Sequence, residues 1–166
     1  MFRIRKNNGI WNFNNYMEYI ESVKDSIPIG IRDFVTDEKR YVFYGKDTLY
    51  DAQLISIQFR KNGICILWVS PYYDRTYKFV FKEISKLVMN AVPDKLTSLL
   101  IHEFAVKDKD IYNYRFLFFC GTEIRISCSK INIYEQCITE SLKKQLMSRL
   151  QMFDENVGKS GTNDLI

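Results

Sequence analysis

His102 is the only histidine in the chain, so most acid–base or metal chemistry would have to begin with it. It lies in an alternating stretch that starts at Ser98 and shares its phase with Leu100, Phe104 and Val106. This phase places His102 on the apolar face of a strand, beside the core. A lone general base would also need a positioned nucleophile and an orienting acid. The pattern therefore favours a structural histidine.

Cysteine is the other residue type that could supply a nucleophile or a metal ligand. The four cysteines form no CxxC pair and have no histidine at zinc-site spacing; they are Cys65, Cys120, Cys128 and Cys137. Cys120 or Cys128 could meet His102 across strands, but no local signature for such a pair is present. Three of the four lie in apolar stretches, where a free cysteine acts as a small hydrophobic residue. We therefore expect no metal and no cofactor.

The remaining catalytic motifs fail on spacing or context. Residues 158–160 read Gly-Lys-Ser, but a phosphate-binding loop needs a glycine five positions earlier, and that position is Phe153. Carboxylates four positions apart lie in loop-like sequence, where aspartate most often supports turns: Asp33 with Asp37, and Asp47 with Asp51. Glu83 and Glu103 could face a pocket, but spacing alone assigns them no role. The sequence predicts that the protein is not an enzyme.

Composition places these residues in one small globular unit. The chain has 166 residues, 46% of them hydrophobic and 15% aromatic, with a net charge of +4. This size and apolar content predict a single domain over residues 1–153, and the polar residues 154–166 predict a disordered tail. The first residues contain no apolar run of signal-peptide length, and no run approaches the ~20 residues of a membrane span. We expect a cytoplasmic protein with no membrane partner.

Apolar alternation with a period of two dominates the middle of the chain. Alternating or apolar segments predict strands near residues 53–60, 64–69, 77–81, 99–106, 112–118 and 124–133. Asn62-Gly63 predicts a hairpin between the first two. The apolar phase changes between Cys128 and Ile131, which indicates a β-bulge near Lys130.

Two segments have helical periodicity instead. Tyr16, Tyr19, Ile20 and Val23 predict a helix from Asn14 to Asp25, and Ile27-Pro28 ends it. Towards the C-terminus, Ile138, Leu142, Leu146 and Leu150 predict an amphipathic helix with Thr139 as its cap. A short strand is predicted at Phe2–Arg5. The fold class is therefore α+β: an antiparallel meander of five or six strands with an N-terminal and a C-terminal helix packed on it.

Aromatic residues beside arginine are common contact residues in protein interfaces, and two predicted turns contain them. One group is Trp68, Tyr72, Tyr73 and Arg75; the other is Tyr112, Tyr114 and Arg115. The alternative interpretation is that most of these rings belong to the core, since they lie in alternating strands.

The segment from Thr48 to Leu54 reads Thr-Leu-Tyr-Asp-Ala-Gln-Leu, and two alternating strands and a Phe-rich third follow it. This pattern resembles small bacterial immunity proteins of contact-dependent and other polymorphic toxin systems, in which Leu-His-Asp-(Ala/Ser) opens the first strand. Tyr50 stands where that pattern has histidine. The resemblance covers residues 48–133. It implies a non-enzymatic cytoplasmic inhibitor that binds a cognate toxin protein and occludes its active site.

A second hypothesis is a single-stranded nucleic-acid binder, in which strand aromatics stack on bases and basic residues contact phosphates. The basic residues would be Arg60, Lys61, Lys78, Lys82, Arg115 and Arg125. The small net charge, with lysines spread along the chain, argues against nucleic acid as the partner.

Overall fold

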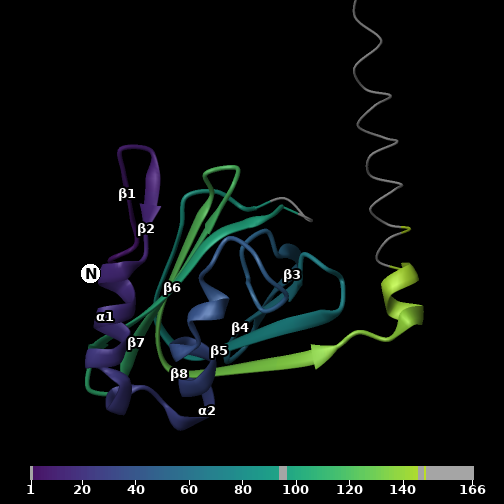
Figure 1. Ribbon diagram of the computed structural model, residues 1–166. Coiled ribbons are helices and arrows are strands. Elements are labelled where there is room, and N and C mark those ends of the chain that lie inside the picture. Colours follow the sequence, from purple (N-terminus) through teal and green to yellow (C-terminus); the bar gives the residue numbers. More distant parts are fainter. Residues whose placement is uncertain (1, 94–96, 146–147, 149–166) are drawn as a thin grey trace, which may run out of the picture.

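A six-stranded antiparallel sheet and a two-stranded hairpin make up the β structure of the computed structural model, which describes residues 2–93, 97–145 and 148 (Figure 1). The main sheet contains β3 (Gln53–Arg60), β4 (Gly63–Val69), β5 (Arg75–Met89), β6 (Leu99–Asp108), β7 (Ile111–Phe118) and β8 (Glu123–Cys137). The hairpin is β1 (Arg5–Asn7) with β2 (Ile10–Asn12), and the helical segments are α1 (Asn14–Ser22), η1 (Lys24–Ser26), α2 (Ile29–Thr36) and η2 (Glu38–Arg40). The predicted α+β class is confirmed.

The strand order differs from the simple meander that the sequence predicts. The order is β3-β4-β5-β8-β7-β6, so two three-strand meanders meet where β5 pairs with β8. The chain leaves β5, crosses to the far edge at β6 and returns. Near their starts the two edge strands also meet, through a bridge between Gln53 and Ser98 and a 3.0 Å hydrogen bond from Leu54 N to Thr97 O. The sheet is thereby partly closed.

The core lies between the sheet and the two helices. Alternation along β5 and β7 buries Tyr77, Phe79, Phe81, Tyr112, Tyr114, Phe116 and Phe118, and β4 adds Trp68. Tyr16 and Ile20 of α1 and Ile31 and Val35 of α2 complete the same cluster. Aromatic rings meet edge to face across the strands, as between Phe79 and Phe116 at 5.3 Å.

The N-terminal segment differs from its prediction in detail. Instead of a strand at Phe2–Arg5, residues 5–12 form the β1–β2 hairpin, whose turn residues Asn8 and Gly9 both have positive φ (49° and 84°). The helix predicted from Asn14 is confirmed as α1, and the 3₁₀ turn η1 continues it to Ser26, just before Pro28. The sequence analysis did not predict α2, because it is only eight residues long.

The side of the sheet formed by β6 is covered by α1. Tyr16 Oη accepts a hydrogen bond from Phe104 N (2.9 Å), and Tyr19 Oη accepts one from Val106 N (2.8 Å). Tyr19 Oη also donates to Val106 O at 3.2 Å. Two edge amides of β6 are therefore paired with side-chain hydroxyls instead of another strand.

The predicted change of phase in β8 is present, because Cys128 and Ile131 are both buried although three positions separate them. The irregular pairing itself falls on the neighbouring strand, between Ile84 and Lys86 of β5, next to Glu83 with φ 52°. The prediction located the ladder irregularity correctly along the sheet but on the wrong strand. Similarly, the β3–β4 hairpin is confirmed, with Arg60 opposite Gly63, so its loop is Lys61-Asn62 instead of Asn62-Gly63.

The C-terminal helix begins at Glu140, where Thr139 Oγ1 accepts from Leu142 N (3.3 Å) and so confirms the predicted cap. The described part of this helix is not packed on the sheet: Leu142 is 40% exposed, and the turn projects beyond the end of β8 (Figure 1). Leu146, Leu150 and the predicted tail at 154–166 lie outside the described residues. Among the described residues, no helix is long and apolar enough to cross a membrane.

Candidate partner-binding site

Three of the seven predicted contact residues belong to the core. Trp68 is fully buried, with its ring 5.4 Å from the rings of both Phe116 and Phe118. Tyr114 is fully buried and Tyr112 is 7% exposed, because even-numbered residues of β7 face the helices. In this structure the three rings lie in the core and present almost no surface to a partner.

Arg115 is also tied into the protein. Its guanidinium contacts Glu123 at 2.5 Å and lies 3.6 Å from the buried carboxylate of Glu103. Glu103 accepts hydrogen bonds from the backbone N–H groups of Arg3 and Ile4 and so holds the N-terminal segment against β6. Burial raises the pKa of Glu103, although these donors act in the opposite direction. Arg115 therefore serves to balance a buried charge.

The turn before β5 places the other predicted residues at the surface. Tyr72 is 53% exposed, while Tyr73 is half-buried with φ 53°. The Ser70 hydroxyl donates to the carboxylate of Asp74 at 2.6 Å. Partial burial alone would raise the pKa of Asp74, but hydrogen bonds from Ser70 and Arg75 outweigh it and hold this pKa below its usual range.

Arg75 sits at the centre of an ion-pair network. Its guanidinium contacts Asp47 at 2.8 Å, Glu135 at 2.7 Å and Asp74 at 3.2 Å. Arg40 joins the network through Glu135, at 2.8 Å. Because Asp47 lies in the loop between η2 and β3, the network fixes this loop to β5 and β8. Arg75 therefore has a structural role, because it joins this loop to the two strands.

The loop fixed by Arg75 contributes to an exposed cluster of rings that the sequence analysis did not predict. Phe13 meets Phe43 at 5.2 Å, Phe43 meets Tyr50 at 4.7 Å, and Tyr50 meets Phe119 at 5.4 Å. Phe43 is 39% exposed and Phe119 is 50% exposed, while Phe13 and Tyr50 are half-buried. We call these four residues the aromatic surface.

Local hydrogen bonds explain why the loop holds its rings outward. Thr48 is buried, with its hydroxyl 2.5 Å from Val42 O and 2.9 Å from Tyr50 N. Leu49 and Ala52 are fully buried, so Tyr50 is held between two buried positions. A sequence signal for Phe119 does exist: it follows Phe118 directly and is therefore out of phase with the buried residues of β7.

The histidine behaves as predicted. His102 is 3% exposed, with Nδ1 2.9 Å from Tyr114 Oη and Nε2 3.0 Å from Arg40 O. Burial lowers its pKa to about 4, so the ring is neutral near pH 7. Both ring nitrogens are occupied by protein groups. Within the described residues, no group of three or more His, Cys, Asp or Glu side chains could hold a metal ion.

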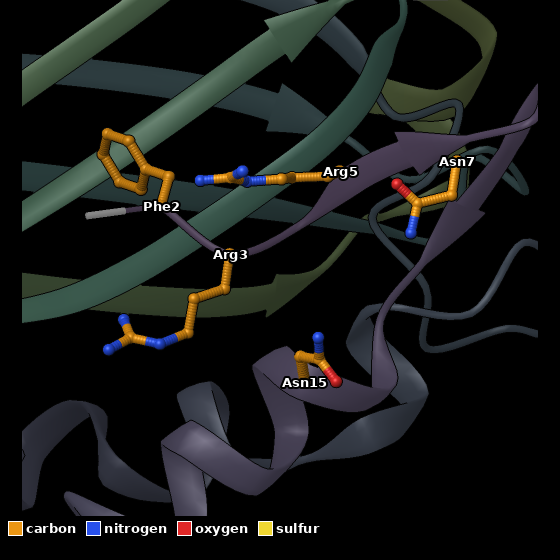
Figure 2. Close-up of a pocket in the computed structure, with 5 residues that line it drawn as sticks. All are labelled: Phe2, Arg3, Arg5, Asn7 and Asn15. Atoms are coloured by element: carbon orange, nitrogen blue, oxygen red, sulfur yellow. The ribbon is translucent and has the colours of Figure 1, made fainter.

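A basic cavity of about 490 Å³ opens beside the N-terminal segment (Figure 2). It is lined by Phe2, Arg3, Arg5, Asn7 and Asn15. The Arg3 guanidinium lies 3.4 Å from the centroid of the Tyr19 ring, which holds this side chain towards α1. Guanidinium and amide donors of this kind suit carboxylate or phosphate oxygens. The sequence analysis did not single out these residues, since hairpin β1–β2 and α1 bring them together.

Most of the basic residues of the nucleic-acid hypothesis are exposed on the strands. Arg60, Lys61, Lys78, Lys82 and Arg125 all face solvent, whereas Arg115 does not. Lys78 Nζ lies 5.8 Å from the ring of Tyr134, which is 54% exposed. These residues are on different segments from those of the aromatic surface.

No model of a known protein family matches the chain, and a search of curated proteins also finds no match.

Proposed function

We propose that this chain is a protein-binding module that acts as a cytoplasmic immunity protein, and that the aromatic surface binds its toxin partner. The observation that carries the proposal is the row of four touching rings, two of them 39% and 50% exposed, on loops of a well-packed domain. Aromatic side chains supply large contact area at low entropic cost, and they dominate the binding energy of many interfaces.

The resemblance to immunity proteins also supports the aromatic surface as the binding site. Tyr50 occupies the histidine position of the pattern that opens the first strand, and Tyr50 belongs to the aromatic surface. The flanking residues have structural roles: Leu49 and Ala52 are buried, and Asp51 adopts φ 62°. Buried Leu49 and Ala52 can maintain the fold of this segment while the residue at position 50, which is partly exposed, varies with the partner.

The loop is also suited to binding because it is already ordered. The Arg75–Asp47 ion pair and the Thr48 hydrogen bonds fix it in the free protein. Binding then loses less conformational entropy than it would with a mobile loop. In this proposal the rings fill the active-site cleft of the toxin and block access of its substrate.

The test combines binding with neutralisation. The tagged protein is purified gently from its native host, and a co-purifying partner encoded by a neighbouring gene is expressed alone in a test bacterium. We expect the partner to arrest growth and the wild-type chain to restore it. The double variant Phe43→Ala/Phe119→Ala should weaken binding at least ~10-fold and fail to restore growth.

Tyr134→Ala is the matched control, because Tyr134 is as exposed as Phe119 but lies on β8. It should bind and protect like the wild type. A partner that is not toxic, or a toxin that the double variant still neutralises, would overturn the proposal.

A single-stranded nucleic-acid binder is the second candidate, supported by Lys78 near Tyr134 and by exposed Lys82 on the same strand. Its test is fluorescence anisotropy with single-stranded DNA and RNA at low and high salt. Binding that weakens steeply as salt rises, and that is lost in Lys78→Ala/Lys82→Ala, would favour this candidate.

A further inference from the structure

The outer side of β3 is free of hydrogen bonds over five residues. Near Leu54 the strand is bridged to residues 97–99, but from Ser56 to Arg60 no described residue bonds to the side of β3 that faces away from β4. In an antiparallel strand, alternate residues direct their N–H and C=O groups to each side. We call Ser56–Arg60 the β3 edge.

The β3 edge contains few of the devices that usually block pairing, because the irregularity in the β3–β4 ladder lies before it, between Leu54 and Ser56. It contains no proline, and its one charged residue, Arg60, stands at its end. Ile57 and Phe59 pair with Ile66 and Ile64, which are buried, so their side chains point towards the core side of the sheet. Phe59 is nevertheless 63% exposed, because β3 is the edge strand of the sheet among the described residues. An added strand with apolar residues at matching positions would cover it.

We propose that a second copy of the chain supplies this strand, so that two β3 edges pair antiparallel about Gln58. In this register Ile57 of each copy lies opposite Phe59 of the other, and Ser56 lies opposite Arg60. Cross-strand partners share a face, so apolar residues meet apolar residues and polar residues meet polar ones. The pairing extends the sheet to twelve strands through a two-fold axis.

The charges fit the same arrangement. The two Arg60 residues are four positions apart along the paired strands, about 13 Å at the usual rise per residue. That distance exceeds the ~8 Å screening length at physiological salt. A parallel in-register pairing, or an antiparallel pairing centred closer to Arg60, would bring the two Arg60–Lys61 ends together. This inference does not depend on the proposed function.

The first test is sedimentation velocity from about 1 µM to about 1 mM. We expect a monomer that converts reversibly to a dimer as the concentration rises. Phe59→Lys puts a charge on the core side of the edge and should weaken the dimer at least ~10-fold. Tyr134→Lys, the same kind of change at an exposed site on β8, should leave the dimer unchanged.

The second test fixes the register. In a Cys120→Ser/Cys137→Ser background, which removes both exposed cysteines, Gln58→Cys should form an intermolecular disulfide under mild oxidation. Arg60→Cys in the same background should not, because its symmetry mate is too far away.

A monomer at every concentration would overturn the proposal, and so would a dimer that is indifferent to Phe59→Lys. Cross-linking through Arg60→Cys but not Gln58→Cys would reject the register. Protection of the β3 amides from hydrogen exchange only when a different protein is bound would also overturn the proposal. The β3 edge would then be the binding site of that protein and not of a second copy.

Discussion

At the β6 edge, α1 places the hydroxyls of Tyr16 and Tyr19 against the amides of Phe104 and Val106, while Glu103 holds the N-terminal segment beside them. At the β3 edge, from Ser56 to Arg60, no described residue makes such a contact, and Phe59 is 63% exposed. The two strands border the same sheet, and both carry apolar residues on its core side. They differ in whether other described groups bond to the backbone amides that face away from the sheet.

This difference shows that an edge can be protected by side chains of a neighbouring helix instead of by charges or proline. The β6 edge has many interactions to lose, including buried polar groups whose partners are all within the protein. The β3 edge has few. Substitutions at the β6 edge should therefore alter folding stability, whereas substitutions at the β3 edge should alter association.

The largest effect is expected for Glu103→Ala. Removing this fully buried carboxylate leaves the N–H groups of Arg3 and Ile4 without their acceptor, and it leaves Arg115 with Glu123 as its remaining charge partner. Urea unfolding should show a loss of about 4 kcal/mol. Glu103→Gln keeps an acceptor and should lose less; equal losses in the two variants would show that the acceptor does not matter.

The next effect is a dependence of stability on pH that originates in the same strand. The pKa of His102 is lowered from its ordinary 6.5 to about 4 by burial, so its contribution is present above pH 6.5 and is lost as pH falls towards 4. We expect the free energy of unfolding to fall by roughly 3 kcal/mol over this range relative to His102→Gln. Parallel pH profiles for the two proteins would contradict this.

Tyr16→Phe should have a smaller effect. The change removes only a hydroxyl, but it leaves the buried amide of Phe104 without an acceptor and ends the contact with Tyr41 Oη at 3.1 Å. A loss of about 2 kcal/mol is expected in thermal or urea unfolding. Tyr134→Phe, at an exposed site, should lose almost nothing, and faster hydrogen exchange should be concentrated at Phe104.

The smallest effect on stability is expected for Phe59→Lys. The side chain is mostly exposed in the monomer, so below the concentration at which the chain associates the free energy of unfolding should change by less than ~0.5 kcal/mol. Urea unfolding in dilute solution measures it. A loss comparable to that of Tyr16→Phe would show that the β3 edge is covered in the monomer after all.

The sequence predicted the regular parts of this fold for a physical reason. Where one face of a strand is buried, apolar residues recur every second position, as in Tyr77, Phe79 and Phe81, and such a pattern can be read without the structure. The crossing of the chain from β5 to β6 could not be predicted, because alternation is the same whichever strands are neighbours. Position in the sheet depends on contacts between residues far apart in sequence.

The same limit explains the predicted contact residues. Tyr114 and Tyr72 are both tyrosines near an arginine, yet one is fully buried and the other is 53% exposed. Residue type predicts what a ring can contribute, whereas exposure depends on which face the sheet turns to the helices. The aromatic surface was not predicted because Phe13, Phe43 and Phe119 come from three separate segments.

The pairing of Tyr16 with Phe104 joins residues 88 positions apart, and this separation has a consequence for synthesis. At ribosomal rates of roughly 5–20 residues per second, α1 is made about 4 to 18 s before β6. A helix of this length forms in far less than a millisecond. The segment that carries both hydroxyls is thus synthesised before β6 and is available to pair with this edge as soon as the strand emerges.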